Sequence, residues 1–447
     1  MVRTGPSAAL AVCCLLTAAS GEPETDGHRF WPAWRGPLGT GAAPHADPPL
    51  EWSETRNLRW KAALPGGGHS TPVVWGDRIF ITAAVPYGEP LRPKFSGLPG
   101  SHDERPVTHR HRFVVLALGR DTGQVLWQRV VREALPRAGG HYTASLASAS
   151  AVTDGEHLVA SFGSHGIYGL DLDGELLWEL DLGPMEPLHG HGEGSSPALA
   201  GGTLIINWDH EGESFLAAFD KGTGALRWKS PRAPASSWTT PVVAHAGGHP
   251  QVVVSGSGGV RGYDLADGRR IWECPGLSVE NVVATPVAGF GLVFAGSSYD
   301  RQAVLAIPLQ PSEGETGGSR RAAWSLTRGA PYVPSFLLYG DALYFVRHFQ
   351  NILSRVDART GRERPGPMRL KGLDRVFASP VAAAGRVYVT SRNGVTAVVS
   401  HSDSPALLAT NRLDDSFSAS AALAGGELYL RGRHHLYCIA EPAPTAR

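Results

Sequence analysis

The residues best suited to chemistry in this sequence are histidines and carboxylates that gather in one stretch. His189, His191 and Glu193 alternate with glycine, and Asp209 and His210 follow a short distance along the chain. Neutral imidazole and carboxylate groups are good ligands for zinc and other divalent ions. This group predicts a metal site. The alternative is that these histidines, among the 18 of the chain, only form hydrogen bonds in loops.

Other polar and aromatic residues stand beside short apolar runs, where loops enter or leave strands. Arginines such as Arg301, Arg347 and Arg392 can clamp an anion or pair with nearby carboxylates. Aromatic rings can stack on a flat ligand or a sugar, or fill the mouth of a channel. The predicted ligand-binding residues are His69, His165, Glu193, Trp238, Asn281, Tyr332, Arg347 and Phe377.

No common catalytic motif accompanies these residues. The chain lacks Gly-x-Ser-x-Gly, His-Glu-x-x-His and the phosphate-binding Gly-Lys-Ser/Thr loop. Catalytic residues are therefore unassigned, and the sequence favours a binding protein over an enzyme.

A repeated unit of about 45 residues supplies the framework that must position these side chains. Its first half begins with Ser or Thr before Pro, continues as an apolar run and turns at Gly-Asp, as between Ser70 and Ile81. Its second half contains an Asp-x-x-Gly turn and ends in tryptophan, as at Trp127, Trp178 and Trp228. Alternating apolar residues predict half-buried strands, and the turns supply the positive φ angles that hairpins need.

This pattern predicts an all-β fold, a β-propeller of about eight four-stranded blades. Seven blades are the alternative, because the unit near 300–330 is irregular. The recurring tryptophan is expected to cover the gap between adjacent sheets. The last repeat runs out of strands, whereas the segment 57–62 looks like a final tryptophan strand with no blade before it. We expect that segment to complete the last blade and close the ring, which removes exposed sheet edges.

The N-terminus has the features of an export signal. Arg3 precedes an apolar run from Ala8 to Ala19, so we expect a periplasmic or secreted protein, with lipid anchoring through Cys13 less favoured. No later segment is long and apolar enough for a transmembrane helix. The predicted organisation is a signal peptide at 1–20, an N-terminal extension at 21–56, a single propeller at 57–441 and a C-terminal tail at 442–447.

Charge and cysteine content narrow the range of partners. The 41 basic residues equal the 41 acidic residues, which gives no electrostatic footprint for nucleic acid or an anionic membrane surface. The partner is then an unidentified protein or small molecule, and the chain is expected to be a monomer. Cys274 and Cys438 are the two cysteines beyond the signal, and we expect them to be free and buried.

One face of the predicted propeller collects the candidate residues. In a four-stranded meander, the loop that enters the innermost strand and the loop between the second and third strands emerge on the same face. The candidates lie in these loops, so this is the expected binding face. On it, an insertion from Pro86 to Arg112 carries His102, His109 and His111. We interpret the insertion as a lid or partner-docking loop, with a disordered loop of low importance as the alternative.

The half-units Ser-Pro-Val-x-x-Gly-Asp and Asp-x-x-Thr-Gly-x-x-x-Trp resemble the repeats of PQQ-binding-like β-propellers over most of residues 30–440. The stretch from Phe30 to Pro37 resembles the N-terminal segment of exported bacterial members. That family contains quinoprotein dehydrogenases and non-enzymatic outer-membrane assembly proteins. The resemblance therefore implies the fold, and function has to be argued from the site.

Three functional hypotheses follow. The leading one is a non-catalytic propeller that binds a protein or small ligand on its top face. The alternative that the resemblance implies is a PQQ- and calcium-dependent oxidoreductase, in which Glu193 and Asn281 would supply oxygen ligands to calcium. Against it, the adjacent cysteines Cys13 and Cys14 lie in the signal, whereas many such enzymes carry an adjacent-cysteine disulfide over the quinone. The third is a metal-dependent enzyme that uses the His189 and His191 patch.

Overall fold

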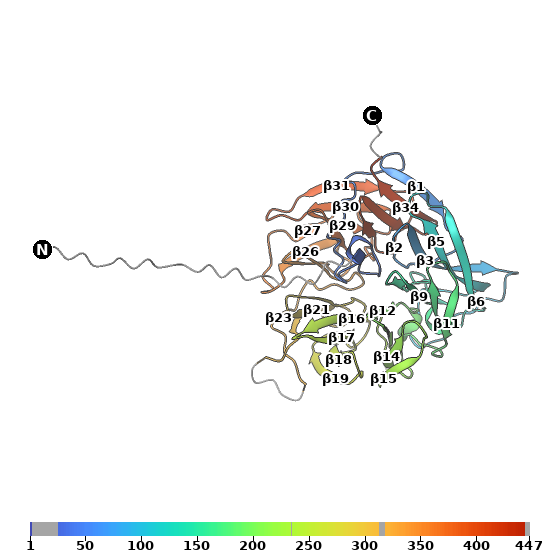
Figure 1. Cartoon of the computed structure of the whole chain (residues 1–447), viewed down its shortest axis with the longest axis horizontal. Helices are drawn as coiled ribbons and strands as arrows, with labels where there is room; N and C mark the ends of the chain where they lie inside the picture. Colours follow the sequence, from blue (N-terminus) through green and yellow to red (C-terminus); the bar gives the residue numbers. More distant parts are fainter. Residues whose placement is uncertain (2–25, 234, 313–317, 443–447) are drawn as a thin grey trace.

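Eight four-stranded antiparallel sheets surround a central channel (Figure 1). The computed structural model describes Met1 and residues 26–233, 235–312 and 318–442, so the predicted signal peptide and most of the C-terminal tail lie outside the described residues. The first strand of each sheet contacts the first strand of the next sheet, and β32 contacts β2. This closed ring confirms the eight-bladed all-β propeller rather than the seven-bladed alternative.

The blades follow the chain in order. Blades one to four contain β2 (Val73–Trp75), β3 (Arg78–Tyr87), β5 (Arg110–Gly119) and β6 (Val125–Ala134); β8 (Val152–Thr153), β9 (His157–Ser161), β10 (Ile167–Asp171) and β11 (Leu176–Leu180); β12 (Ala198–Ala200), β13 (Thr203–Trp208), β14 (Phe215–Asp220) and β15 (Leu226–Pro231); and β16 (Val242–Ala246), β17 (His249–Gly256), β18 (Gly259–Asp264) and β19 (Arg270–Pro275). Blades five to eight contain β20 (Val287–Gly289), β21 (Leu292–Ser297), β22 (Ala303–Pro308) and β23 (Trp324–Leu326); β24 (Leu337–Tyr339), β25 (Ala342–Val346), β26 (Ile352–Asp357) and β27 (Met368–Arg369); β28 (Val381–Ala383), β29 (Arg386–Thr390), β30 (Val395–Ser400) and β31 (Leu407–Arg412); and β32 (Ala422–Ala424), β33 (Glu427–Arg431), β34 (His435–Ala440) and β1 (Leu58–Ala63). The remaining short elements are the 3-10 turns η1 (Asp26–Arg29), η2 (Gly163–His165) and η3 (Leu188–Gly190) and the strands β4 (Glu104–Arg105) and β7 (Gly140–His141).

The N-terminal strand β1 forms the outer edge of blade eight. It pairs antiparallel with β34, and Leu58 lies opposite Ile439 while Ala63 lies opposite His435. The segment predicted at 57–62 therefore completes the last blade, one residue further along the chain. Pairing the first strand with the last joins the two ends of the chain into one ring.

Hydroxyl groups at the start of the inner strands connect one blade to the next. The backbone N–H of each donates to the side-chain oxygen of its counterpart one blade further on, at 2.9–3.1 Å, in seven steps along Thr71, Ser150, Ser196, Thr240, Thr285, Ser335, Ser379 and Ser420. At the seam the series stops, because Thr71 Oγ1 has no partner among the described residues. There the buried Arg431 of blade eight donates to the carbonyl oxygen of Ser70 instead. The Ser/Thr of the repeat is thus an inter-blade hydrogen-bonding residue.

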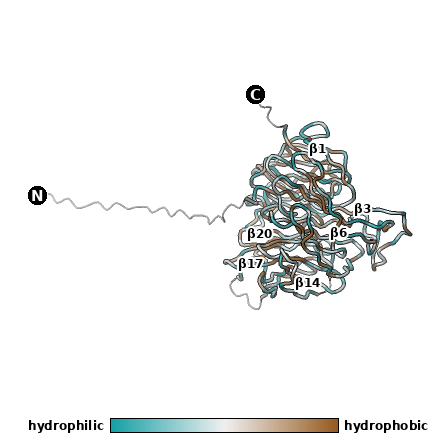
Figure 2. The backbone as a smooth tube through the Cα atoms, turned by 45° about the vertical axis from the view of Figure 1, so that its right-hand side comes forward, coloured by the Kyte–Doolittle hydropathy of each residue, from teal (hydrophilic) through white to brown (hydrophobic). Residues whose placement is uncertain are grey.

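The recurring tryptophans join neighbouring blades at the outer rim, as predicted. The indole Nε1 donates to a backbone carbonyl in the turn of the next blade at Trp60, Trp127, Trp178, Trp228 and Trp324. The ring lies so close to the glycine of that turn that a Cβ at Gly174 would stand 2.8 Å from Trp127. Trp272 departs from this pattern and donates to Gln251 Oε1 at 2.7 Å, within its own blade. The core fills the spaces between the sheets, and Figure 2 shows the apolar residues following the strands.

The N-terminal extension covers the end of the channel opposite the predicted binding face. Trp31 is fully buried and bridges Val74 of the first inner strand. Arg35 is also buried and donates to the carbonyls of Phe336 and Pro380 at 2.7 and 2.8 Å, on the far side of the ring. In Figure 1 this segment is the blue trace near the centre of the ring. The extension predicted as a separate region is therefore packed into the propeller.

The insertion in blade one is ordered over its described length. Strands β3 and β5 continue into it as a hairpin and pair as far as Tyr87 opposite Arg110. Within the excursion, β4 pairs with β7, which lies on the way to blade two. Pro86 and Arg112, the predicted limits, are paired strand residues, so the excursion proper is shorter than predicted. Within it, only β4 and a bridge between Lys94 and Val107 are paired among the described residues.

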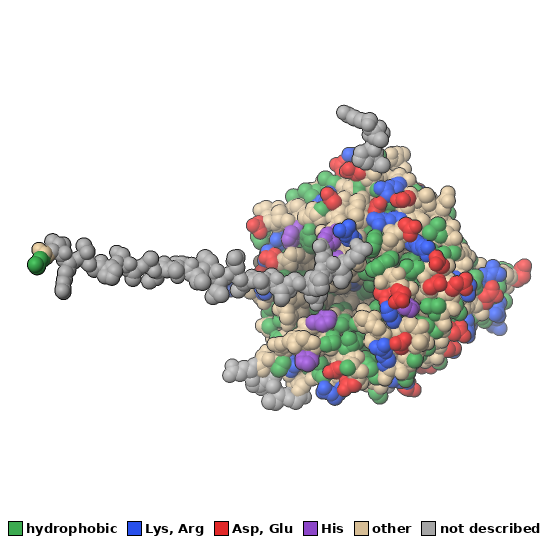
Figure 3. Space-filling model, viewed as in Figure 1, with side chains coloured by type: hydrophobic (Ala, Val, Ile, Leu, Met, Phe, Trp, Pro, Cys, Tyr) green, Lys and Arg blue, Asp and Glu red, His purple; other side chains and the backbone are tan. Residues whose placement is uncertain are grey.

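Two further expectations concern cysteine and the membrane. Cys274 and Cys438 are both buried, and neither forms a disulfide within the described residues, as predicted. Within the described part of the chain, every helical turn is too short to cross a bilayer. Basic and acidic side chains intermingle over the face in Figure 3, in keeping with the balanced charge of the chain.

Candidate functional site

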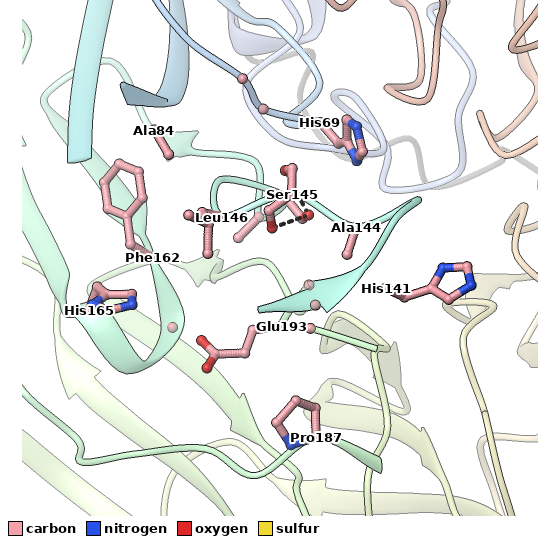
Figure 4. Close-up of a pocket in the computed structure, with 18 of the residues that line it drawn as sticks. His69, Ala84, His141, Ala144, Ser145, Leu146, Phe162, His165, Pro187 and Glu193 are labelled. Carbon is pink, nitrogen blue, oxygen red and sulfur yellow. Dashed lines mark hydrogen bonds between the residues drawn. The ribbon is translucent and has the colours of Figure 1, made fainter. Parts of the chain in front are cut away.

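A cavity of about 830 Å³ lies where the loops of blades one, two and three meet the mouth of the channel (Figure 4). It is lined by loops that enter the inner strands, including 64–69, 137–149 and 184–195, by the insertion, and by η2. These are loops of the face that the sequence predicted for binding.

Glu193 lies in the wall of the cavity with its carboxylate turned towards blade two. Ser164 donates to it twice, from its backbone N–H at 2.7 Å and from its hydroxyl at 2.5 Å. Burial raises the pKa of Glu193 above its ordinary value, and the two hydrogen bonds oppose that shift. A side chain at Gly163 would overlap the carboxylate, with a Cβ 1.6 Å from Oε2, so this close approach requires glycine. Glu193 is thus held in place by the η2 turn.

His69 and His165 both line the cavity as uncharged imidazoles. Burial, together with Arg431, Arg392, Arg105 and Arg433, lowers the pKa of His69 to about 3. His165 stacks on the Phe113 ring at a centroid distance of 4.3 Å, and burial lowers its pKa to about 4. Desolvation disfavours a charged ring in both places, and the arginines repel it further at His69.

Trp238 closes the side of the cavity near blade four. Its Nε1 donates to the carbonyl of Gly192 at 2.7 Å, and its ring lies 6.1 Å from the ring of His191. This hydrogen bond fixes the indole against the loop that carries His189 and His191. Its role is therefore partly to hold that loop.

Four arginines line the cavity and have no acidic partner within the described part of the chain: Arg105, Arg137, Arg392 on blade seven and Arg433 on blade eight. The guanidinium of Arg392 is half-buried and rests over the rings of Phe377 at 5.0 Å and Tyr142 at 5.9 Å. Burial lowers the pKa of Arg392, and Arg375, Arg105 and Arg433 lower it further. The lining also contains three carboxylates, Glu186, Glu193 and Asp209; because Asp209 is paired with Arg232, the four arginines outnumber the two that remain. The cavity is therefore positively charged.

Asp209 and His210 do not join the metal site that the sequence predicted. Both oxygens of Asp209 accept from the buried Arg232, at 2.6 and 2.8 Å, and Ser237 donates to it as well. His210 Nδ1 accepts the backbone N–H groups of Gly212 and Glu186 at 3.0 and 3.2 Å. Both side chains shape their own loops, because buried polar groups must be satisfied locally.

His189 and His191 stay together, but their neighbours are other histidines. His102 from the insertion and His141 from β7 surround them, with ring centroids 5.3–6.4 Å apart. Sequence reasoning noticed His102 only as part of the insertion and did not select His141. Nothing in the local sequence marks His141, since its place beside His191 depends on the pairing of β7 with β4.

Three predicted residues lie outside the cavity lining, on blades five to seven. Tyr332 stacks between His348 and Tyr299, at 4.7 and 5.8 Å, and burial raises its pKa to about 12. Arg347 donates to Ser354 and pairs with Glu363 at 3.1 Å. Phe377 does not line the cavity but supports Arg392, as described above. The aromatic residues here fill the mouth of the channel, which is the alternative that the sequence had left open.

Asn281 is buried to 1% exposure in a left-handed conformation, at φ 49°. Neither atom of its amide makes a hydrogen bond of ordinary geometry within the described residues. It lies next to His191. Burial lowers the pKa of His191 to about 4, and the Asn281 amide opposes that shift. Buried amides ordinarily form hydrogen bonds, and the polar group beside this one is the His191 ring.

A calcium-bound quinone does not fit the predicted pair of ligands. Calcium requires six to eight oxygen ligands. Glu193 accepts two hydrogen bonds from Ser164, whereas Asn281 adjoins the imidazole of His191. Among the described residues, no group of three clustered metal-ligand side chains includes Glu193. The arginines do suit the carboxylates of such a quinone, but the oxygen-rich calcium centre is not assembled by these side chains.

The fold and repeats agree with known proteins. A family model described as outer membrane protein assembly factor BamB, built on PQQ-like repeats, matches residues 50–187 and 111–364, and the chain belongs to this family. A comparison with curated protein sequences gave no match.

Solved structures show the same architecture at low sequence identity. Quinohemoprotein alcohol dehydrogenase from Comamonas testosteroni is 9% identical, with a TM-score of 0.60 over 94% of this chain and 82% of that one. Quinohemoprotein alcohol dehydrogenase ADHIIG from Pseudomonas putida is 11% identical, with a TM-score of 0.53 over the same shares. BamB from Moraxella catarrhalis is 15% identical, with a TM-score of 0.40 over 85% of this chain and 99% of that one. At these identities the likeness to the two dehydrogenases concerns the fold alone, and the likeness to the BamB structure, with a TM-score below 0.5, carries no argument.

Proposed function

We propose that this propeller is a binding protein that holds a small anionic molecule in the cavity of blades one to three. The observation that carries the proposal is the set of four cavity arginines, Arg105, Arg137, Arg392 and Arg433, which have no acidic partner among the described residues. Guanidinium groups are the usual protein ligands of carboxylates and phosphates, because their planar donors match two oxygens at once.

The electrostatics of the cavity support an anion over a neutral or cationic ligand. The arginines depress the pKa of His69 and of one another, so the same field attracts negative charge. The cavity volume of about 830 Å³ is in the range of sites for small organic molecules. Apolar walls at Phe162 and Leu146 would cover the uncharged part of such a molecule.

The family resemblance adds one candidate to this ligand class. The quinone PQQ is a flat tricarboxylate, and its anionic groups suit the arginines. The calcium-dependent oxidoreductase alternative needs an oxygen-rich metal centre as well, which Glu193 and Asn281 do not form. We therefore treat the quinone as one anion among several, and we assign no reaction to the site.

The test measures anion binding to the purified mature protein at low salt. Inorganic phosphate, citrate and PQQ, the last with and without calcium, are titrated by calorimetry and by thermal shift. We expect at least one of them to bind with an affinity that falls as salt increases, because the contact is between exposed charges. If none of the three shifts the melting temperature or releases heat, the proposal is overturned.

Matched arginine variants localise the binding. Arg392→Gln is expected to weaken anion binding by about tenfold or more, since it removes the half-buried guanidinium of the cavity. Arg347→Gln is the control, because Arg347 is paired with Glu363 outside the cavity. Equal affinities of the two variants would place the anion elsewhere on the protein.

A protein partner is the second candidate, and a different part of the same face favours it. Val279, Tyr299 and Phe349 are 59%, 43% and 54% exposed at the loops of blades four to six. Exposed apolar groups of this kind mark protein contact sites. Capture of a reproducible partner by the native chain, lost with Phe349→Ser but kept with Arg392→Gln, would support this candidate.

We also propose that residues 1–20 direct export and that the propeller begins after an extension at 21–56. The arginine and apolar run at the N-terminus support export. N-terminal sequencing of the protein from the periplasmic fraction tests this, and an intact Met1 would contradict it.

A further inference from the structure

Four histidines from three separate segments meet beside the rim of the cavity. His102 comes from the insertion, His141 from β7 between blades one and two, and His189 and His191 from the η3 loop between blades two and three. His141 and the neighbouring Gly190 and Gly192 also line the cavity. The cluster thus lies where the insertion contacts the loops of blade three.

Three of the rings are nearly equidistant. The centroids of His102, His141 and His191 lie 5.4, 5.4 and 5.3 Å apart, at interplanar angles of 78°, 87° and 71°. At a tetrahedral metal with metal–nitrogen bonds of about 2.1 Å, nitrogens lie about 3.4 Å apart and ring centroids about 5 Å. The Nε2 atoms of His102 and His191 are 3.5 Å apart. These spacings match three imidazoles around one ion.

His141 becomes the third ligand of this group if one imidazole ring makes a half-turn. Ligand atoms of His102, Asp103 and His141 already lie within 4.8 Å of one another. A half-turn of an imidazole about its Cβ–Cγ bond exchanges nitrogens for carbons at an almost unchanged ring position. His102 is 54% exposed at its side chain, so its ring has room to turn.

Each ring has a polar group behind it. His102 Nδ1 lies 3.4 Å from Asp103 Oδ2, and His141 Nδ1 lies 2.6 Å from Thr143 Oγ1. His191 has the amide of Asn281 beside it. Metal-binding histidines ordinarily donate their second ring N–H to such a partner, which fixes the ring and its tautomer. Asp103 can accept from His102 in this way, whereas His141 Nδ1 also accepts the backbone N–H of Thr143 at 3.3 Å.

Two observations separate this cluster from histidines that only satisfy a loop. His102 and His191 direct their Nε2 atoms at each other rather than at a carbonyl or a carboxylate. Asn281 is fully buried against the cluster, and its amide has no partner of ordinary geometry in the described chain. Likewise, His189 Nδ1 is buried without a hydrogen bond and its Nε2 lies 3.9 Å from Glu280.

We propose that His102, His141 and His191 bind a divalent transition-metal ion of the Zn²⁺ class, with His189 as the adjacent fourth group. Imidazole ligands favour zinc, copper and nickel over calcium or magnesium. Because His102 belongs to the insertion and the other ligands to fixed loops, the ion ties the insertion down beside the cavity. This site is separate from the arginines that carry the proposed anion binding.

The test uses the mature protein after removal of metals with EDTA and dialysis. Zn²⁺ is titrated by calorimetry, and Ni²⁺ in parallel. We expect one equivalent to bind, with affinity reduced at least about tenfold in His102→Gln and in His191→Gln. His245→Gln, an exposed histidine of β16, is the control and should bind as the wild type does.

A second readout follows the insertion itself. Trypsin has one productive site in the excursion, after Lys94, because Arg92 and Arg105 precede proline. Zn²⁺ is expected to slow cleavage at Lys94 several-fold in the wild type and not in His102→Gln. Absence of stoichiometric binding, or wild-type affinity in both cluster variants, overturns the proposal. Anion binding by the EDTA-treated protein distinguishes that failure from failure of the proposed function.

Discussion

The two sides of the propeller mouth use similar loops in different ways. On blades one to three, which we call the open half, the loops form a cavity and a cluster of imidazoles, and arginines from the insertion, from the loop into blade two and from blades seven and eight reach that cavity. On blades five to seven, the filled half, Tyr332, His348 and Phe349 stack on one another, and Arg347 is paired with Glu363. The backbone framework is the same in both halves, so the difference comes from what each loop meets.

The comparison teaches that loop polarity alone does not identify a site. Both halves carry histidines, arginines and aromatic rings at equivalent repeat positions. In the filled half these groups stack on or pair with each other. In the open half the insertion adds loops at the channel mouth. Several polar groups there have no hydrogen-bond or ion-pair partner among the described residues.

The largest expected effect is a loss of stability when the N-terminal part of the ring, which both halves depend on, is removed. Removal of residues 21–63 takes away β1 and the buried Trp31 and Arg35. We expect a loss of roughly 5 kcal/mol or more of stability, because a sheet edge is exposed and buried groups lose their partners. Thermal denaturation measures the loss, and hydrogen exchange should locate it at blade eight. An unchanged melting temperature would show that the ring does not depend on this strand.

The second prediction concerns a buried pair of the open half. Asp209→Ala leaves the guanidinium of Arg232, 5% exposed, without its carboxylate. Breaking a buried ion pair by removing one partner costs about 3–5 kcal/mol. Urea denaturation is the measurement, and Glu363→Ala, which removes an exposed partner in the filled half, should cost less than about 1 kcal/mol. Similar losses of unfolding free energy in the two variants would contradict the difference between a buried and an exposed ion pair. Reduced zinc binding in Asp209→Ala would show that Asp209 does contribute to the metal site.

The third prediction is that the inter-blade hydroxyl groups contribute equally to stability in both halves. Ser150→Ala and Ser335→Ala each leave a buried backbone N–H without its acceptor, at Thr71 and at Thr285. Each should cost about 1–3 kcal/mol, since the desolvated donor is unsatisfied. The costs are compared by chemical denaturation. A much larger effect in one half would mean that the relay of hydroxyl groups is not equivalent around the ring.

The smallest expected effect is a change in pH dependence. Burial raises the pKa of Glu193, so the folded state keeps its proton where the unfolded state has released it. Its contribution to stability is fully present below the ordinary glutamate pKa of 4.5 and declines as pH rises through the raised value. Glu193→Gln should therefore show a flatter decline in melting temperature between acidic and neutral pH. A steeper decline in the variant would contradict the raised pKa of this carboxyl group.

Local sequence predicted the strands and their junctions well, because their causes are local. The Asp-x-x-Gly turns, the alternating apolar residues and the tryptophans appear where the repeat placed them, and blade eight closes with β1. The excursion of the insertion was predicted too long, since nothing in the residues around Pro86 shows that β3 and β5 continue to pair there.

The candidate site was predicted in part. His69, His165, Glu193 and Trp238 line the cavity, whereas Tyr332 and Arg347 belong to the filled half. Asp209 was predicted as a metal ligand, but its carboxylate is paired with Arg232. These outcomes depend on contacts between loops of different blades, which no residue spacing within one blade records.

The repeat could be recognised from the residues alone, and with it a ring of about eight blades, the tryptophans that cover the gaps between them, and the face on which the polar loops emerge. These follow from period-two burial and from turn residues, which act over a few neighbours. Only the tertiary structure decided that His141 and His102 lie beside His191, that four arginines line the cavity unpaired, and that the aromatic rings of blades five and six fill their side. The physical reason is that a side chain is free for a ligand only when no other segment of the folded chain has satisfied it.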